Sequence, residues 1–397
     1  MVTVAAAGTL LVAALASMFM AWTIGAGSSG STPFAPAVGA NAIPVMRAGF
    51  YVGLLGFLGA VLQGANVSEA VGRGLISGAT LTSVAVIVAL LTAATLVAVG
   101  VFTGYPIATA FTVTGAVVGT GLAMGGAPAW DKYAQIAALW ALVPFVGGFT
   151  SFATAYGLRE IDRDALLVPA LAAVIGALVA NVKFVLLGPP GVGQSLATTV
   201  ARAFPGVPTT LAVAGATAAI ALVVAGLVRW DVRENGDAGN RHFLLALGGL
   251  VAFSAGGSQV GLAVGPLLPL VGDSVPTTYV LVGGGLGLLV GSWTGAPRMI
   301  KALAQDYSSL GPRRSIAALI PSFAIAQAAV FFGVPVSFNE IIVSAIVGGG
   351  YAAGSAGGGV SREKMLKTVA AWVGSLAIAL AASYAVFHAA DVALGLT

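Results

Sequence analysis

The sequence predicts an all-α membrane protein of about twelve transmembrane helices, arranged as two inverted repeats with broken or re-entrant helices. Three observations predict this fold class: a charge-poor composition, a series of long apolar windows, and a pair of motifs that recurs in the second half. Of the 397 residues, 58% are hydrophobic and 8% are charged, and the mean hydropathy is +1.01. A soluble domain carries about 25% charged residues. Because this chain could not cover a surface in water, we expect a lipid bilayer as its solvent.

The expected helices follow from the length of the apolar windows. A spanning helix needs about 20 mostly apolar residues. Windows of this kind cover residues 3–26, 46–65, 78–101, 105–125, 135–156, 166–187, 208–230, 242–270, 278–296, 315–332, 335–354 and 368–392. The windows 105–125 and 335–354 are rich in glycine and begin near a proline, so each could span fully or re-enter as a hairpin.

The remaining composition excludes several classes of function. The chain has no cysteine, so it has no disulfide, no zinc-thiolate site and no cysteine nucleophile. The net charge of +4 comes from basic residues in short loops, which indicates membrane topology and not nucleic-acid binding. We therefore expect no nucleic-acid partner, no resident cofactor and no metal other than a coupling sodium ion.

Two motifs recur in the same order. Ile24–Thr32 resembles Ser254–Gly261, and Gly104–Thr109 resembles Gly333–Ser337. Pro106 follows Gly39 by 67 residues (106 − 39), and Pro335 follows Gly265 by 70 (335 − 265). The spacing predicts a first repeat at 1–157, middle helices and a linker at 158–241, and a second repeat at 242–397. The alternative is that glycine-rich helices resemble one another by composition alone.

The basic residues predict the orientation. Seven windows separate the partner helices, an odd number, so the two halves are inverted if all twelve windows span. With the linker 229–241 in the cytoplasm, thirteen of the seventeen basic residues lie inside, and Arg73, Lys132, Lys183 and Arg202 lie outside. Cytoplasmic loops carry an excess of lysine and arginine. We therefore expect a multi-pass protein of the cell membrane with both termini extracellular.

The serine-rich and glycine-rich motifs predict the substrate site. Irregular backbone within a membrane is tolerated where it lines a cavity, and broken helices of inverted repeats meet near the midplane in transporters. Helix N-termini with nearby hydroxyl groups bind anions. The candidate residues in the two halves are Ser28, Ser29, Ser31 and Thr32, and Gly257, Ser258 and Gln259. The alternative is that these small residues only allow close helix packing.

The same motifs carry a resemblance to a known family. The first motif, its continuation Leu58–Glu69, the segment Gly333–Ser337 and the segment Arg298–Arg314 resemble the inorganic phosphate transporter (PiT) family. The resemblance covers both halves and implies twelve helices in inverted repeats, a homodimer, and phosphate transport with sodium or protons.

The chain departs from the hallmark of this family at defined positions. The hallmark Asn-Asp pair falls on Gly27-Ser28 in one half and on Ser258-Gln259 in the other, so both aspartates are missing. A following Ser-Thr-Thr-His stretch falls on Ala108–Phe111 and on Ser337–Glu340. The resemblance thus adds Thr109, Ser337 and Asn339 to the substrate candidates. Glu340 falls where the family has histidine. We expect it to be the cation or proton coupling residue, because ionisable residues inside a membrane are rare and functional. The alternative is a neutral Glu340 that is hydrogen-bonded within the bundle.

The substrate follows from the donors and from the resemblance. Phosphate near neutral pH still carries a proton, which suits an acceptor carboxylate, whereas sulfate needs only the donors that Ser, Thr, Gln and backbone N–H groups provide. We expect a secondary active transporter of a small oxyanion by ion-coupled symport, with phosphate as the substrate and a sulfate permease of the same family as the alternative. A passive anion channel, and an intramembrane hydrolase that uses His242 or His388, are further alternatives, and we expect no enzyme.

Overall fold

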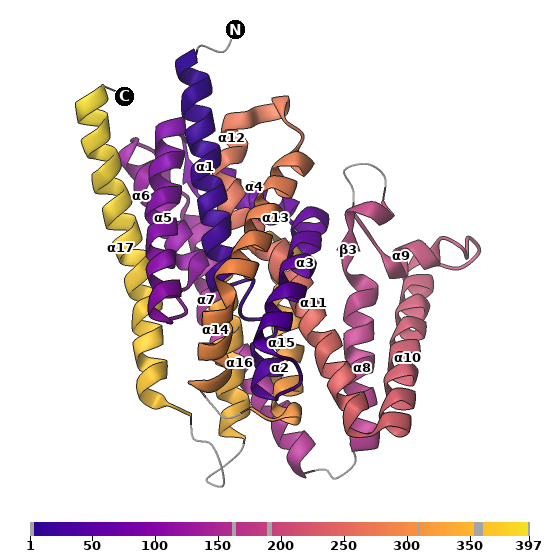
Figure 1. The fold of residues 1–397 in the computed structure, drawn as a ribbon. Helices are drawn as coiled ribbons and strands as arrows, with labels where there is room; N and C mark the ends of the chain where they lie inside the picture. The colour runs from indigo at the N-terminus through magenta and orange to yellow at the C-terminus, as the bar shows by residue number, and fades with distance from the viewer. Residues whose placement is uncertain (1–3, 161–163, 189–192, 308–309, 353–359, 396–397) are drawn as a thin grey trace.

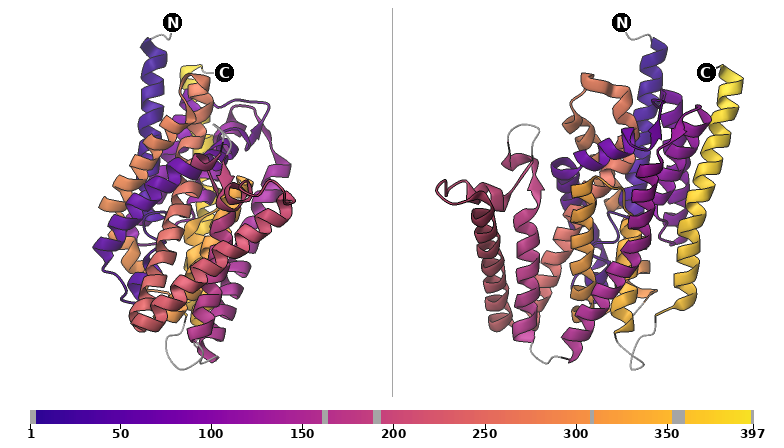
Figure 2. Two further views of the ribbon diagram at one scale, coloured as in Figure 1. Left: turned by 90° about the vertical axis from the view of Figure 1, so that its right-hand side faces the viewer. Right: turned by 180° about the vertical axis from the view of Figure 1, so that it is seen from behind.

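The computed structural model describes residues 4–160, 164–188, 193–307, 310–352 and 360–395. The described chain forms a bundle of helices, with two small two-stranded antiparallel sheets in its loops. Both termini lie at the same end of the bundle, as Figures 1 and 2 show. We refer to this end as the termini end and to the other as the linker end, because the junction of the two helices around Gly236 lies there.

The first half begins with a helix that stops halfway through the bundle. The elements are α1 (Val4–Gly27), α2 (Ala35–Gly39), α3 (Val45–Gln63), α4 (Ala65–Arg73), β1 (Ile76–Ser77), α5 (Ser83–Thr103), α6 (Thr109–Ala123), β2 (Ala127–Pro128) and α7 (Trp130–Glu160). The Thr82 side chain caps α5, and Gly104, with a φ of 77°, ends it. Since this left-handed conformation suits glycine, the chain can turn sharply there into α6.

The middle segment lies at one side of the bundle. It consists of α8 (Asp164–Asn181), β3 (Lys183–Phe184), η1 (Val185–Leu187), β4 (Gln194–Ser195), α9 (Leu196–Ala201) and α10 (Thr209–Asn235). Strands β3 and β4 pair with each other, with Lys183 opposite Ser195. Helices α8 and α10 pack side by side, at the right of Figure 1.

The second half repeats the order of the first. It consists of α11 (Asp237–Val264), η2 (Gly265–Leu267), α12 (Leu268–Val271), η3 (Gly272–Ser274), α13 (Thr277–Thr294), α14 (Ala296–Gln305), α15 (Pro312–Phe332), α16 (Phe338–Tyr351) and α17 (Arg362–Leu394). Gly333, with a φ of 59°, ends α15 as Gly104 ends α5.

The two halves are related by direction and by packing. The hairpin of α5 and α6 begins and ends toward the termini end, whereas the hairpin of α15 and α16 begins and ends toward the linker end (Figure 1). Helix α6 packs on α17 and α16 packs on α7, while α1 packs on α13 and α11 packs on α3. Each half thus packs its hairpin on the last helix of the other half. These relationships support the predicted inverted repeat, and the predicted bounds of the three segments stay a prediction.

The structure confirms an all-helical membrane fold but not the count of twelve spans. In the described residues, eight helices are long and apolar enough to cross a membrane, or up to nine if α13 and α14, bent by 64°, count as one span. The two Pro-led windows form the half-length helices α6 and α16, and α8 has a 16-residue apolar part. The ends of two windows, residue 3 and residues 353–354, lie outside the described residues.

Glycines let the central helices approach closely. A Cβ atom added at Gly25 would lie 2.1 Å from the carbonyl oxygen of Leu288, and one at Gly256 would lie 1.9 Å from that of Gly56. The first contact joins α1 to α13 and the second joins α11 to α3. Because no side chain fits at these positions, small residues here determine how near the helices lie.

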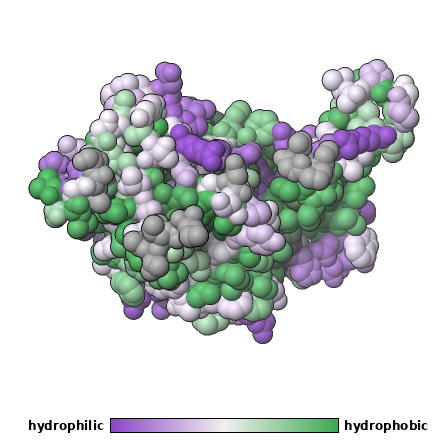
Figure 3. All heavy atoms as spheres, turned by 90° about the horizontal axis from the view of Figure 1, so that it is seen from above, coloured by the Kyte–Doolittle hydropathy of each residue, from purple (hydrophilic) through white to green (hydrophobic). Residues whose placement is uncertain are grey.

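The exposed surface agrees with a lipid environment. Large apolar side chains such as Phe145, Phe149 and Leu222 are more than two-thirds exposed along the flanks of the bundle. The termini end, by contrast, mixes hydrophilic and apolar side chains (Figure 3). Exposed apolar surface of this extent is characteristic of a protein that contacts acyl chains.

Candidate functional site

The first motif forms a break in the middle of the bundle. Helix α1 ends at Gly27, and turns over residues 28–34 lead into α2. The side chains of Ser28, Ser29, Ser31 and Thr32 are all buried. The hydroxyl groups of Ser31 and Thr32 donate to the carbonyl oxygen of Ser28, and that of Ser29 donates to Ile24 O. These three hydroxyls therefore support the turn, and Ser28 is the residue whose side chain reaches another element.

Three side chains from three elements meet next to this break. Ser28 Oγ and Thr109 Oγ1 donate to the same oxygen, Gln259 Oε1, at 3.1 and 2.9 Å. The amide nitrogen of Gln259 donates to Val336 O, in the segment before α16. Gln259 thus joins α1, α6, α11 and the second hairpin, and all three side chains are buried. We call Ser28, Thr109 and Gln259 the central cluster.

The expectation of a matching break at Gly257–Gln259 is wrong. Helix α11 continues through these residues to Val264, and the irregular segment η2 begins only at Gly265. The reason is packing, since a Cβ atom at Gly257 would lie 2.8 Å from Gln63 Cβ and one at Gly261 would lie 2.6 Å from Ser68 N. The glycines bring α3 and α4 against α11 while the helix stays intact. Ser258 Oγ, at 3.4 Å from Ala255 O, bonds within its own helix.

The second hairpin supplies a fourth side chain. Asn339 Nδ2 donates to Gly27 O at 2.9 Å and to Ile107 O at 2.7 Å, so it links α16 to the break and to the first hairpin. Asn339 Oδ1 is buried and has no hydrogen-bond partner among the described residues. Ser337 does not reach the cluster, because its hydroxyl caps α16 by accepting from Glu340 N.

A tryptophan from each half holds the tip of the opposite hairpin. Trp140 Nε1 on α7 donates to Pro335 O at 3.0 Å, and Trp372 Nε1 on α17 donates to Pro106 O at 2.8 Å. Trp140 also stacks on Phe111, with ring centroids 3.8 Å apart. The motif analysis missed this pair, although the separation of the two tryptophans nearly equals that of the repeated motifs.

Glu340 faces away from the central cluster. It is 1% exposed, and its Oε2 atom has no hydrogen-bond partner among the described residues. Its side chain lines a largely apolar cavity of about 770 Å³ between α6, α7, α16 and α17, together with Phe111, Trp140 and Trp372. Since successive residues of a helix point about 100° apart, Asn339 and Glu340 serve different sides of α16.

Polar contacts join the hairpins to α4 and α14. Asn66 Nδ2 on α4 approaches Val330 O near the end of α15 at 3.4 Å, and Arg298 Nη1 on α14 donates to Phe102 O near the end of α5 at 2.9 Å.

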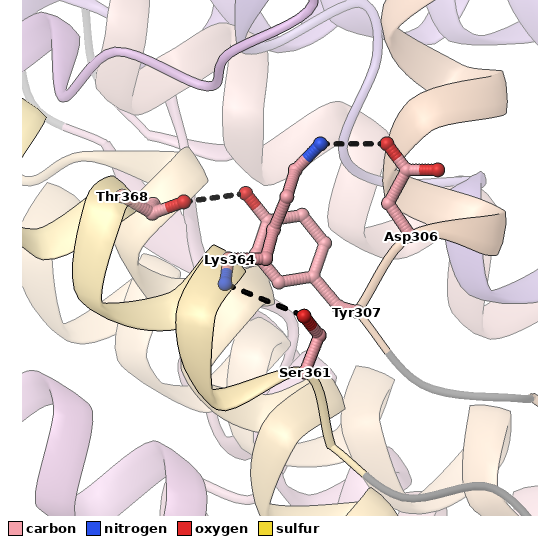
Figure 4. A network of polar contacts seen from close by, with 5 residues as sticks. All are labelled: Asp306, Tyr307, Ser361, Lys364 and Thr368. Atoms are coloured by element: carbon pink, nitrogen blue, oxygen red, sulfur yellow. Dashed lines mark hydrogen bonds and ion pairs between the residues drawn. The ribbon is translucent and has the colours of Figure 1, made fainter.

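Figure 4 shows a further network at the linker end, where the loop after α14 meets the start of α17. Lys364 Nζ lies 2.7 Å from Asp306 Oδ2, and Tyr307 Oη lies 2.7 Å from Thr368 Oγ1. Burial raises the pKa of Tyr307, so its phenol stays protonated and can hydrogen-bond to Thr368. Arg298, which donates to Phe102 O from helix α14, is not part of this network.

The histidines do not form a hydrolase site. His242 Nδ1 lies 2.9 Å from Asp231 Oδ2 at the linker end, and His388 stacks on Tyr384 near the C-terminus. Within the described parts of the chain, neither is hydrogen-bonded to a serine. No group of three or more His, Cys, Asp or Glu residues that could hold a metal occurs in these parts either.

Comparison with known proteins decides the family. The model of the phosphate transporter family matches residues 24–383, which include most of both predicted repeats and the whole central cluster. The chain belongs to this family. It is 25% identical over 432 residues to a protein of Arabidopsis thaliana named inorganic phosphate transporter 2-1, chloroplastic, with 94% of this chain and 70% of the relative covered.

The fold has a solved counterpart. The structure of a protein described as the sodium-dependent phosphate transporter covers 98% of this chain, with a TM-score of 0.80 and 23% sequence identity, and is itself covered completely. Because the chain belongs to the phosphate transporter family and has at least eight apolar helices of spanning length among its described residues, it is a multi-pass membrane transporter and not an enzyme. The family does not favour the hydrolase, the channel or the sulfate permease.

Proposed function

We propose that this transporter carries inorganic phosphate across the membrane by cation-coupled symport, with the central cluster as the substrate site. The observation that carries the proposal is the convergence of Ser28, Thr109 and Gln259 at a helix break. The family and the relatives named for phosphate support the choice of anion. The resemblance to PiT proteins supports a homodimer, which stays a prediction.

The chemistry of the cluster suits an oxyanion that replaces internal hydrogen bonds. In the structure, the hydroxyls of Ser28 and Thr109 donate to Gln259 Oε1. When phosphate binds, the same hydroxyls and the Gln259 amide can turn to its oxygens, and Asn339 Oδ1 can accept the proton that phosphate retains. The other candidates would support this cluster and not contact phosphate. The hydroxyls of Ser29, Ser31, Thr32, Ser258 and Ser337 bond to backbone groups of their own segments, and Gly257 lies within the unbroken helix α11. Such a site binds without a fixed positive charge, so a cation carried with the anion would neutralise it.

Two different sets of residues could hold the coupling ion. The name of the structural counterpart favours sodium. The carbonyl oxygens of Gly27 and Ile107, which accept from Asn339 Nδ2, are hard oxygen ligands of the kind that sodium takes. Glu340 is the second candidate, for a sodium ion or a proton, because it is a buried carboxyl with an unpartnered oxygen on the first turn of α16. Alternating access would then move the hairpin that carries both Asn339 and Glu340.

We infer that the termini end is extracellular. The basic residues that the positive-inside pattern assigns to the cytoplasm lie on elements that begin or end at the linker end, including the ends of α7 and α10 and the starts of α15 and α17. Arg163 lies outside the described residues. This distribution supports a cytoplasmic linker end.

Uptake into proteoliposomes tests the proposed function. Purified protein is reconstituted, and uptake of radiolabelled phosphate is followed with an inward sodium gradient, an inward proton gradient or neither, with sulfate as competitor. We expect concentrative phosphate uptake with one of the gradients and weak competition by sulfate. Equal uptake without any gradient would show a channel, and preferential uptake of sulfate would show a sulfate permease.

A further inference from the structure

Two adjoining pockets lie beside the β3–β4 hairpin, which joins the end of α8 to the start of α9 on the side of the termini end (Figure 1). The first has a volume of about 520 Å³ and lies between α3, α4, α8 and α15. The second has a volume of about 740 Å³ and lies between the hairpin, α9 and the start of α10. They share Asn181, Lys183, Gly193 and Phe331, so Lys183 stands at their common border.

The charged side chains among the described residues that line these pockets are all basic. Lys183 lines both pockets and Arg202 lines the second, and no acidic residue is among the described residues that line either one. These are two of the four basic residues that the orientation analysis places outside. Lys183 has no ion pair within the described parts of the chain, and its Nζ lies 4.9 Å from the centre of the Phe331 ring. The ammonium group is therefore available to an anion.

The neutral lining adds hydrogen-bond donors. Asn66, Gln63 and Gln327 line the first pocket, and Gln194, Ser195 and Thr198 line the second. These side chains carry amide or hydroxyl hydrogens. A tetrahedral oxyanion needs a positive charge and hydrogen-bond donors. Gln63 and Gln327 donate their amide hydrogens to protein acceptors, so Asn66, Gln194 and Ser195 are the neutral donors that can turn to an anion, and no carboxylate is among the described lining residues.

The pocket is tied to the central helix of the site. Gln63 Nε2 donates to Lys183 O at 3.0 Å, which anchors the strand that carries Lys183. Gln327 Nε2 approaches Gln63 Oε1 at 3.2 Å and donates to Ser254 Oγ at 2.6 Å. Ser254 lies on α11, five residues before Gln259 of the central cluster. Polar side chains thus extend from the pocket wall to the helix that supplies the site.

We propose that these adjoining pockets form an outer phosphate-binding subsite, with Lys183 as its principal charge and Arg202 as a second one. The proposal rests on the proposed function and deepens it: the subsite concentrates phosphate at the termini end before the anion reaches the central cluster. Because both charges face water, the subsite binds weakly and acts on the capture of phosphate. It leaves the turnover of the loaded transporter unchanged, and added salt screens it.

Protection of lysine from acylation tests the subsite without transport. Purified protein is treated with a water-soluble acylating reagent in sodium phosphate or in sodium chloride of equal ionic strength, and the modification of each lysine is measured by mass spectrometry. We expect phosphate to slow the acylation of Lys183 at least about threefold and to leave that of Lys132 unchanged. Lys132 is the matched internal control, since it lies at the same end, bonds to Gln135 and lines neither pocket. Equal acylation of Lys183 in both salts would overturn the proposal.

Transport kinetics test the consequence of the subsite. Lys183→Gln and Lys132→Gln each remove one positive charge from the same end. We expect Lys183→Gln to raise the KM for phosphate about three- to tenfold with an unchanged maximal rate, an effect that shrinks in 0.5 M salt (an estimate from screening and steering). Lys132→Gln should behave as wild type. If the two variants have the same KM, the subsite has no role in capture and the proposal fails. Absence of phosphate uptake by the wild type would instead refute the proposed function, and protection of Lys183 would still report on the subsite.

Discussion

Ser28 Oγ donates a hydrogen bond to Gln259 Oε1 across 3.1 Å, although 231 residues separate them in the chain. These are the two positions on which the family resemblance places the hallmark aspartates. Two carboxylates at this distance would repel each other and would need a cation or a proton between them. The neutral pair needs neither, so the chain holds its repeats together at this point by a plain hydrogen bond.

Loss of the Ser28 hydroxyl should weaken phosphate binding. A hydrogen bond to a charged group contributes roughly 1.5–3 kcal/mol, so we expect Ser28→Ala to lower the affinity about 10- to 100-fold. The measurement is the KM for phosphate in proteoliposomes, supported by equilibrium binding to purified protein. Ser322→Ala is a matched control, because Ser322 is equally buried and its hydroxyl donates to Ala318 O in its own helix. A Ser28→Ala protein that binds phosphate like wild type would remove Ser28 from the site.

Neutralisation of Glu340 should separate accumulation from exchange. If Glu340 carries the driving ion, Glu340→Gln abolishes uptake against a gradient and leaves phosphate–phosphate exchange largely intact. Both are measured in the same proteoliposomes, under sodium and proton gradients in turn. Glu69→Gln is the control, since Glu69 is exposed and pairs with Arg73 on α4. Accumulation at the wild-type level by Glu340→Gln, under either gradient, would assign Glu340 to packing of its cavity.

The orientation can be measured with single cysteines, because the chain has none of its own. We expect Glu69→Cys on α4 to react with an impermeant maleimide from outside the cell. Glu234→Cys and Lys301→Cys should react only after the membrane is opened. Two serines near these positions are less suitable as cysteine sites. Ser68 is fully buried and donates to Gly64 O, and Ser309 lies outside the described residues. Labelling of Glu69→Cys and Lys301→Cys from one side would contradict the inverted repeat.

Close packing of α11 on α3 should make Gly256 intolerant of a methyl group. A Cβ atom there would lie 1.9 Å from Gly56 O, so Gly256→Ala must separate the two helices. We expect a loss of about 1–3 kcal/mol in the free energy of unfolding, seen as a lower thermal midpoint in detergent. Gly283→Ala, also in a helix and with no atom within 4 Å of its Cβ, should leave the midpoint unchanged or raise it. Equal midpoints for the two variants would show that α11 and α3 do not pack as described.

Sequence patterns predicted the class of the fold because a bilayer imposes it. Apolar windows of about 20 residues report the thickness of the hydrocarbon core directly. The two windows 105–125 and 335–354 did not reveal whether they cross the membrane. They are as apolar as a spanning helix, and yet they form the half-length helices α6 and α16. Whether such a segment crosses the membrane or turns back depends on the tertiary contacts made at its end. Here Trp140 and Trp372, from distant helices, bind the hairpin tips.

The sequence by itself determined that this is an all-helical membrane protein with repeated motifs. It proposed Ser28 and Gln259 as site candidates, and the family resemblance added Thr109 and Asn339. Only the tertiary structure decided that Gln259 bonds to Ser28 and Thr109, that α11 stays unbroken at Gly257, and that Glu340 faces a separate cavity. The physical reason is that composition and periodicity depend on whether a segment is surrounded by lipid, water or protein. The direction in which a buried side chain points depends instead on helix rotation and on contacts between residues hundreds of positions apart.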